Sequence, residues 1–307
     1  MVTHQTVADV HQGIIALIEE VATPLPWLEQ IKLLCQARAG NRHARQKDML
    51  PIYACEALGG DRNCAIPVSA AWMLYTIGGR LIDDLQDEEA SELISLLLAP
   101  EAAMNVALAL LPLAQVCLVQ LNASPDLLRQ IISEAGYMLA ALAYGQQQEA
   151  KRNELPSETD YFSALLKKTG NFGATAIWAG ASLGQPELVE NHREHLYDYG
   201  AAVAIRAQLL DDCRDLEQDI GRGVFTLPVI YAAKNNDNAA YPMLQQMLKE
   251  ARVRGDVADL MQFIYEMGGV QMTVEIAERY RIQAVDALES LPDSSAKECL
   301  LAYVSVD

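Results

Sequence analysis

The sequence predicts an all-α protein that folds as a single helical bundle. Ala and Leu dominate the 307 residues, and the Val/Ile/Thr alternation that is typical of strands is rare. Helical periodicity recurs almost throughout the chain, and short stretches rich in Gly, Pro, Asn and Asp interrupt it. No shift in composition marks a domain boundary, so we expect one domain over residues 1–307.

The expected helices lie between five breaks in the chain. These breaks occupy residues 58–67, 121–126, 152–159, 182–187 and 234–242. We expect long helices over residues 68–88 and 196–218, each of which is apolar and ends in acidic residues. In the segment that follows the third break, Ser157 or Thr159 can accept a hydrogen bond as the N-cap of a helix.

Residues 93–121 form the most apolar stretch of the chain. Pro100, Glu101 and Pro112 interrupt it, so we expect two buried helices of a soluble protein here and no membrane span. The N-terminus lacks a basic start followed by a sustained apolar segment, so no signal peptide is expected. Six cysteines without any CxxC pair favour reduced thiols in a cytoplasmic protein over a disulfide framework or a zinc site.

The net charge of −18 argues against a nucleic-acid partner. Binding to phosphate backbones requires a basic face that displaces counterions, and 23 basic side chains stand here against 41 acidic ones. An excess of carboxylates suits solubility and divalent cations instead.

Two acidic clusters with the same spacing are the main functional signal. RLIDDLQDEE spans residues 80–89, and QLLDDCRDLEQD spans residues 208–219. The candidate metal ligands are Asp83, Asp84, Asp87, Asp211, Asp212 and Asp215. On a helix, positions i and i+4 share a face, so the first and last aspartate of each cluster project side by side. Close carboxylates need counter-charge, and oxygen-only ligands select Mg²⁺. A solvated helix end explains one such cluster well, but two clusters favour a metal site, with their ends meeting across a central apolar cavity.

The sequence resembles the trans-isoprenyl diphosphate synthases of the polyprenyl synthetase family, which have the class I isoprenoid (terpenoid) synthase fold. The resemblance covers roughly residues 40–290. The matching stretches are ACEALGGD (54–61), LIDDLQD (81–87), GQQQEA (145–150), DYFSALLKKTG (160–170), QLLDDCRD (208–215) and DIGRGVFTLPVIYA (219–232).

This resemblance implies an allylic diphosphate held between the two acidic clusters by Mg²⁺, three ions per active site. The six aspartates and Lys168 would be the catalytic residues, because metal ions and cations stabilise the charge of the departing diphosphate and leave an allylic carbocation. Thr169 and Gln208 would help to bind the diphosphate. The resemblance also suggests a homodimer.

The hydrocarbon tail of the substrate needs an apolar pocket. Gly78 and Gly79 lie about one turn before Asp83, on the side expected to face the cavity, and small residues there would leave room for a long tail. Close helix packing is the alternative explanation for these glycines. Phe172 could shield a carbocation through its ring face, although buried aromatic residues commonly just fill space.

The expected site for a second substrate, isopentenyl diphosphate, departs from the family pattern. The family's GGKRxRP motif aligns with RHARQKD (42–48), which keeps Arg45 and Lys47 but has Ala44 and Asp48 at the lysine and proline positions. The Arg-Arg pair expected after the first acidic cluster is absent, and Val224 replaces the lysine before TLP. Arg80 and Arg222 are nearby cations, but neither is at a family position.

These departures favour a terpene synthase that cyclises or rearranges farnesyl or geranylgeranyl diphosphate alone. Each lost charge-assisted contact weakens diphosphate binding by about 1.5–3 kcal/mol, so the second substrate would bind poorly. The alternative is a trans-prenyltransferase that condenses isopentenyl diphosphate with an allylic diphosphate, with Arg45, Lys47, Arg80 or Arg222 rebuilding the basic pocket. A partner subunit without catalytic activity is a third hypothesis. The sequence gives neither the product nor the preferred chain length.

Overall fold

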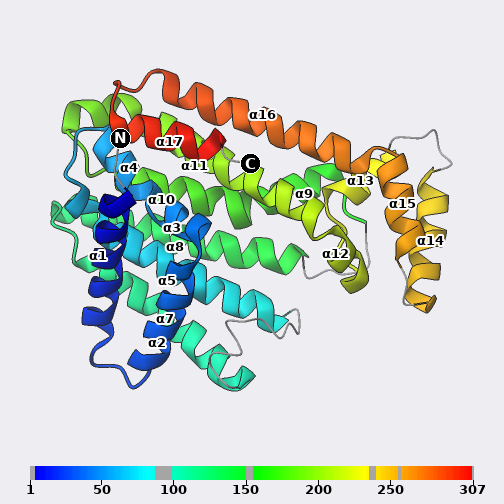
Figure 1. Cartoon of the computed structure of the whole chain (residues 1–307), viewed down its shortest axis with the longest axis horizontal. Coiled ribbons are helices and arrows are strands. Elements are labelled where there is room, and N and C mark those ends of the chain that lie inside the picture. Colours follow the sequence, from blue (N-terminus) through cyan, green and yellow to red (C-terminus); the bar gives the residue numbers. More distant parts are fainter. Residues whose placement is uncertain (1–3, 87–98, 150–154, 235–239, 255–256, 306–307) are drawn as a thin grey trace. The chain divides into compact units, whose positions relative to one another are not determined.

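The computed structural model of the chain describes residues 4–86, 99–149, 155–234, 240–254 and 257–305. Within these ranges every regular element is a helix, which confirms the all-α prediction (Figure 1). The chain forms two compact units, each built from separate stretches of sequence. The first unit comprises residues 1–136, 175–197 and 288–307, and the second comprises residues 137–174 and 198–287. The single domain expected over residues 1–307 stays a prediction.

The first unit is built around a long, buried helix. Its helices are α1 (His4–Ala22), α2 (Leu28–Gly40), α3 (Arg42–Asp48), α4 (Leu50–Ala57), α5 (Arg62–Gln86), α7 (Pro100–Val119) and α17 (Ser295–Ser305). Helix α5 lies beside α7 and also contacts α1 and α4, and α17 packs on α4 (Figure 1). A run of buried residues from Val68 to Tyr75 explains why α5 occupies the centre of this unit.

The described helices that lie wholly in the second unit are all shorter than the 25-residue α5. They are α9 (Glu158–Leu165), a π-helical turn η1 (Leu166–Gly170), α12 (Leu216–Arg222), α13 (Leu227–Lys234), α14 (Ala240–Arg254) and α15 (Ala258–Glu266). Helix α13 contacts α9, α14 and α15, and its apolar residues contribute to two buried clusters. Four further helices contain residues of both units: α8 (Pro125–Glu149), α10 (Asn171–Ala181), α11 (Pro186–Arg214) and α16 (Gly269–Glu289).

The predicted breaks at residues 121–126 and 182–187 are confirmed. Helix α7 ends at Val119 and α8 begins at Pro125, and α10 ends at Ala181 before α11 begins at Pro186. The N-cap prediction is also confirmed, because the backbone N–H of Asp160 donates to Ser157 Oγ at 3.1 Å.

Three predicted helix boundaries were wrong. Helix α5 begins at Arg62 rather than residue 68, and Pro67 lies inside it. Pro67 is the sixth residue of α5 and removes one i to i−4 hydrogen bond, so burial of the helix has to offset this cost. The helix expected over residues 196–218 begins at Pro186 and ends at Arg214, and Asp215 separates it from α12.

Among the described helices, two are long and apolar enough by composition to cross a membrane. They are α5 and the segment Glu101–Val119 of α7, whose most apolar windows are 67% and 44% buried within the protein. Buried core helices meet the same criterion, so composition alone is weak evidence for a span. The absence of a membrane span stays a prediction.

Candidate active site

The first acidic cluster lies at the C-terminal end of α5. Asp83 and Asp84 occupy its last turn, which ends at Gln86. Asp84 is only 6% exposed, and Asp83 is half-buried. Asp87 lies outside the described residues, so the predicted pairing of Asp83 with Asp87 stays a prediction.

The second acidic cluster lies where α11 gives way to α12. Asp211 and Asp212 occupy the last turn of α11, and exposed Asp215 stands between the two helices. The backbone N–H of Asp215 donates to the Asp211 carbonyl at 2.8 Å, so the hydrogen bond of a helical turn persists across the break. This bond supports the i, i+4 spacing that the sequence predicts for the two residues.

Asp212 is buried, 3% exposed, and both of its oxygens accept hydrogen bonds within the second unit. The Tyr161 hydroxyl on α9 donates to Oδ2, and Gln208 Nε2, one turn earlier on α11, donates to Oδ1 at 3.0 Å. Hydrogen bonds to a carboxylate stabilise its charged form and fix its orientation. Gln208, predicted to bind the diphosphate, therefore contacts an aspartate side chain in this structure, and its predicted ligand role stays untested.

Asp211 forms an ion pair with Arg214 one turn later. Arg214 was missed by sequence reasoning, although a cation in the last turn of a helix is a common pattern because it complements the helix dipole. Between these residues, burial followed by the negative charge of Asp212 raises the pKa of Cys213 to about 11. The thiol therefore stays protonated at neutral pH.

Helix α9, which carries Tyr161, is fixed to α13 by Glu158. Its carboxylate accepts hydrogen bonds from Lys234 Nζ and from the Tyr231 hydroxyl, the latter at 2.7 Å. The hydrogen bond from Lys234, followed by that from Tyr231, lowers the pKa of Glu158 below its usual value. Neither Glu158 nor Lys234 was predicted as a positioning residue, because 76 positions separate them.

Lys168 and Thr169 lie on the π-helical turn η1, where both side chains are half-buried. Gly145 of α8 allows this turn to approach closely. A Cβ added at Gly145 would lie 3.0 Å from the backbone nitrogen and Cβ of Lys168 and from the Ala164 carbonyl. Short π-helical insertions often occur at functional sites. Gly145 was quoted in the predicted motif without a role, and the structure gives it a packing role.

The predicted cations lie on different elements. Half-buried Arg45 and exposed Lys47 are on α3, and Arg80 is exposed on α5. These three residues belong to the first unit, whereas half-buried Arg222, at the end of α12, belongs to the second. Their shared role in binding a second diphosphate stays a prediction.

The two glycines predicted to line the hydrocarbon pocket differ in their surroundings. A Cβ added at Gly78 would meet the Ala107 carbonyl at 3.3 Å and Leu110 Cβ at 3.4 Å, so Gly78 faces α7. Gly78 therefore fits the alternative explanation, close packing of α5 on α7, and its place in a hydrocarbon pocket stays a prediction. A Cβ at Gly79 would meet nothing within 4 Å, and its role in a hydrocarbon pocket stays a prediction. Phe172 is half-buried on α10, and its role stays a prediction.

The acidic ends offer oxygen ligands but do not form a complete metal site by themselves. Among the described residues, no group of three or more His, Cys, Asp or Glu side chains converges in a way that could hold a metal ion. Mg²⁺ usually binds only one or two protein carboxylates and completes its shell with water and substrate phosphate oxygens. The donors present therefore fit Mg²⁺, and the predicted meeting of the two clusters across a cavity stays a prediction.

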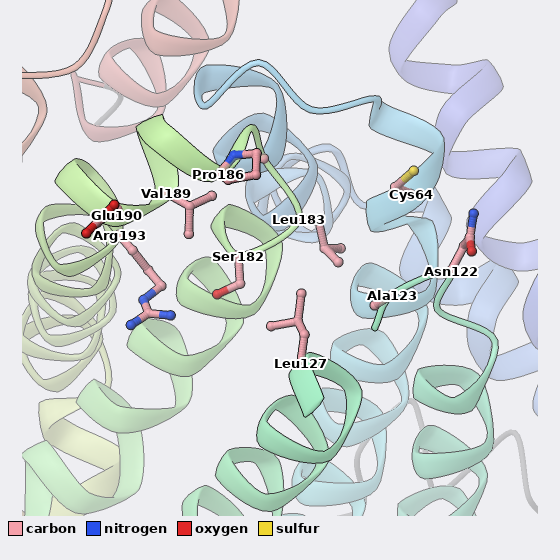
Figure 2. Close-up of a pocket in the computed structure, with 11 residues that line it drawn as sticks. Cys64, Asn122, Ala123, Leu127, Ser182, Leu183, Pro186, Val189, Glu190 and Arg193 are labelled. Carbon is pink, nitrogen blue, oxygen red and sulfur yellow. The ribbon is translucent and has the colours of Figure 1, made fainter. Parts of the chain in front are cut away.

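A separate cavity of about 540 Å³ lies within the first unit (Figure 2). It is lined by the beginnings of α8 and α11, by the segment after α10, and by Cys64 at the start of α5. Arg193 lies on its wall and also stacks over the Trp178 ring, with 5.3 Å between the guanidinium carbon and the ring centre. None of the predicted site residues lines this cavity.

The fold and the acidic helix ends define a helical protein of the isoprenoid synthase class. More specifically, the chain belongs to the polyprenyl synthetase family, whose model matches residues 39–267. This match confirms the family that the motifs predicted.

Relatives and solved structures agree with this assignment. All trans-polyprenyl-diphosphate synthase of Mus musculus is 25% identical over 285 residues, which cover 88% of this chain and 65% of the relative. Octaprenyl diphosphate synthase of Escherichia coli (strain K12) is 24% identical over 309 residues, which cover 95% of this chain and 93% of the relative. Measured against the human and Haemophilus influenzae relatives, the chain spans 54% of their length.

The crystal structure of a polyprenyl synthase from Caulobacter crescentus CB15, complexed with calcium and isoprenyl diphosphate, has a TM-score of 0.82 to this chain. The two chains are 21% identical, and the match covers 96% of this chain and 93% of the other. This similarity confirms the predicted fold.

Proposed function

We propose that this protein is a trans-prenyltransferase that condenses isopentenyl diphosphate with an allylic diphosphate. The observation that carries the proposal is the family match over residues 39–267, which contains both acidic clusters and the Lys168–Thr169 turn. The similar curated proteins named above are diphosphate synthases of polyprenyl chains, and one of them matches over 93% of its length.

The comparisons support this alternative better than the terpene synthase hypothesis. That hypothesis depended on cations missing at three family positions. A diphosphate can be bound by cations at other positions, provided that their side chains reach its oxygens, and Arg45 and Lys47 remain on α3. Missing motif residues are therefore weaker evidence about the reaction than the relationship of the whole chain.

We propose that the aspartates at both helix ends bind Mg²⁺ together with the substrate diphosphate. In the Caulobacter neighbour, calcium and isoprenyl diphosphate occur in the same complex. The ligands in this chain would be Asp83, Asp84, Asp211, Asp212 and Asp215, with Asp87 added from the sequence. Bound metal neutralises diphosphate charge and so makes the diphosphate a better leaving group.

The residues of the chain have separate tasks in the proposed reaction. Tyr161 and Gln208 hold the Asp212 carboxylate ionised and oriented. Lys168 stabilises the negative charge that develops as the C–O bond of the allylic diphosphate breaks. The double bond of isopentenyl diphosphate then forms a C–C bond to the allylic carbon, and loss of a proton restores a double bond. The apolar pocket predicted from the sequence would exclude water that could otherwise capture the cation.

Release of inorganic pyrophosphate tests this proposal. With Mg²⁺ and farnesyl or geranylgeranyl diphosphate, we expect rapid release only after isopentenyl diphosphate is added. Release at the same rate from the allylic diphosphate alone would support the terpene synthase instead. No release under either condition would support a partner subunit without catalytic activity.

Three expectations from the sequence remain proposals. We propose that the protein forms a homodimer and is located in the cytoplasm. We also propose that it binds no nucleic acid and does not span a membrane. Sedimentation analysis of the purified chain tests the first of these directly.

A further inference from the structure

A buried ion-pair cluster joins three helices of the first unit at Asp48. Arg38 of α2 donates to Asp48 Oδ1 from Nη2 at 2.5 Å and from Nε at 3.0 Å, and its Nε also lies 3.0 Å from Oδ2. His11 Nε2 of α1 lies 3.2 Å from Oδ2. An ionised carboxylate only accepts hydrogen bonds, so His11 donates here.

This cluster is excluded from water. The side chains of His11 and Asp48 are each 3% exposed, and that of Arg38 is 12% exposed. The field of the Asp48 carboxylate also reaches Cys35, since burial and then this negative charge raise the pKa of the Cys35 thiol to about 12. A buried carboxylate is stable only where its partners stay in place, so the cluster fixes the geometry of the helices that supply it.

The element that the cluster fixes is α3, which carries Arg45 and Lys47. Helix α3 spans only Arg42–Asp48, seven residues, and a helix of that length is not stable without tertiary contacts. A single residue, Asn41, separates α2 from α3, and its side chain caps α3 by accepting from the Ala44 N–H at 3.0 Å. The Arg38–Asp48 pair also joins α2 to the last residue of α3, so α3 is held at both of its ends.

We propose that Asp48, held by Arg38 and His11, is a positioning residue for isopentenyl diphosphate because it fixes the helix that presents Arg45 and Lys47. This inference rests on the proposed function, in which those two cations bind the second substrate. Both have long, rotatable side chains, so their placement depends on a fixed backbone. Asp48 stands at the position where the family motif has proline, and an ion pair here replaces the backbone constraint of the proline ring.

Calorimetry on the full chain tests the proposal, because isopentenyl diphosphate alone does not turn over and its Kd can be measured directly. In Asp48→Asn, we expect this Kd to rise about ten-fold, since two charge-assisted contacts lose their alignment. The KM for farnesyl diphosphate should stay within about two-fold, because a positioning residue for one substrate leaves the other unaffected. Far-UV circular dichroism confirms that the variant is folded.

Glu56→Gln serves as the matched control. This variant removes an ion pair of the same unit in which Arg62 lies 2.7 Å from Glu56. The side chains of Glu56 and Arg62 are 20% and 30% exposed, and no residue of α3 takes part in the pair. This control should change thermal stability without changing the Kd for isopentenyl diphosphate. If Asp48→Asn does not fold, Arg38→Lys serves in its place, because lysine keeps the charge but cannot form the bidentate contact with Asp48. The same rise in the Kd for isopentenyl diphosphate is expected.

An unchanged Kd in a folded variant, or an equal change for both substrates, would overturn this inference while leaving the proposed function intact. A Glu56→Gln effect as large as that of Asp48→Asn would also overturn it. No binding of isopentenyl diphosphate to the unaltered protein would overturn the proposed function itself, and the inference with it.

Discussion

Asp212 illustrates how single residues prepare this site for a cation. Its carboxylate is buried, and Tyr161 and Gln208 satisfy both oxygens. Burial alone would favour the protonated acid, whereas two donors favour the charged form that a metal ion requires. In the proposed reaction, Tyr161 therefore acts through Asp212 and is a positioning residue.

Removing the Tyr161 hydroxyl tests this role. In Tyr161→Phe, we expect kcat to fall by roughly ten-fold or more, because a hydrogen bond to a charged group contributes about 1.5–3 kcal/mol. A higher Mg²⁺ concentration should recover part of the loss, and a Mg²⁺ titration of the rate measures this recovery.

Tyr137→Phe is the control, since its hydroxyl belongs to a side chain that is 73% exposed in the same unit. It should leave both kcat and the Mg²⁺ dependence unchanged. Full activity with an unchanged Mg²⁺ dependence in Tyr161→Phe would show that the hydrogen bond to Asp212 does not matter for turnover.

At the scale of elements, close packing of α8 places the turn that carries Lys168. Gly145 makes this approach easy, because a Cβ there would lie only 3.0 Å from atoms of Ala164 and Lys168 and would require η1 to move by a few tenths of an ångström. The predicted motif contained both segments, but their contact depends on tertiary packing between positions 23 residues apart and was not visible in the sequence.

Gly145→Ala should destabilise the protein and weaken diphosphate binding. Overpacking costs about 1–3 kcal/mol, which exceeds the roughly 1 kcal/mol that alanine gains over glycine in a helix. Thermal unfolding followed by circular dichroism measures the first effect, and the KM for the allylic diphosphate measures the second.

Gly136→Ala, on the same helix, provides the comparison. A Cβ at this exposed position would meet nothing within 4 Å, so alanine should raise the melting temperature slightly. Equal stabilities of the two variants would contradict the packing role of Gly145.

Sequence patterns predicted where helices end better than they predicted which residues contact one another. Helix ends at Val119 and Ala181 were predictable because Pro and Gly lie in the following breaks. Pocket and packing roles stayed open for Gly78 and Gly79, because the two glycines share one local pattern and only the contact of Gly78 with α7 distinguishes them. In the sequence, Asp48 stood out only because the family motif has proline at this position. Its contact with His11 was not predictable, because 37 positions separate the two residues.

At the scale of the whole molecule, the family was predictable and the reaction within it was not. Two acidic clusters, the Lys168–Thr169 segment and the TLP run identified the polyprenyl synthetase family. The choice between cyclisation and chain elongation depends on whether a second diphosphate binds, and a cation can serve that purpose from several positions. Counting motif residues therefore favoured the reaction that the family relationship supports less well.

The fate of labelled isopentenyl diphosphate tests the central claim most directly. The protein is incubated with Mg²⁺, geranylgeranyl diphosphate and uniformly ¹³C-labelled isopentenyl diphosphate, and the products are analysed by mass spectrometry. We predict longer prenyl diphosphates that contain whole labelled isoprene units, and no product when the labelled substrate is omitted. An unlabelled hydrocarbon or terpene alcohol, formed equally well without isopentenyl diphosphate, would contradict the claim.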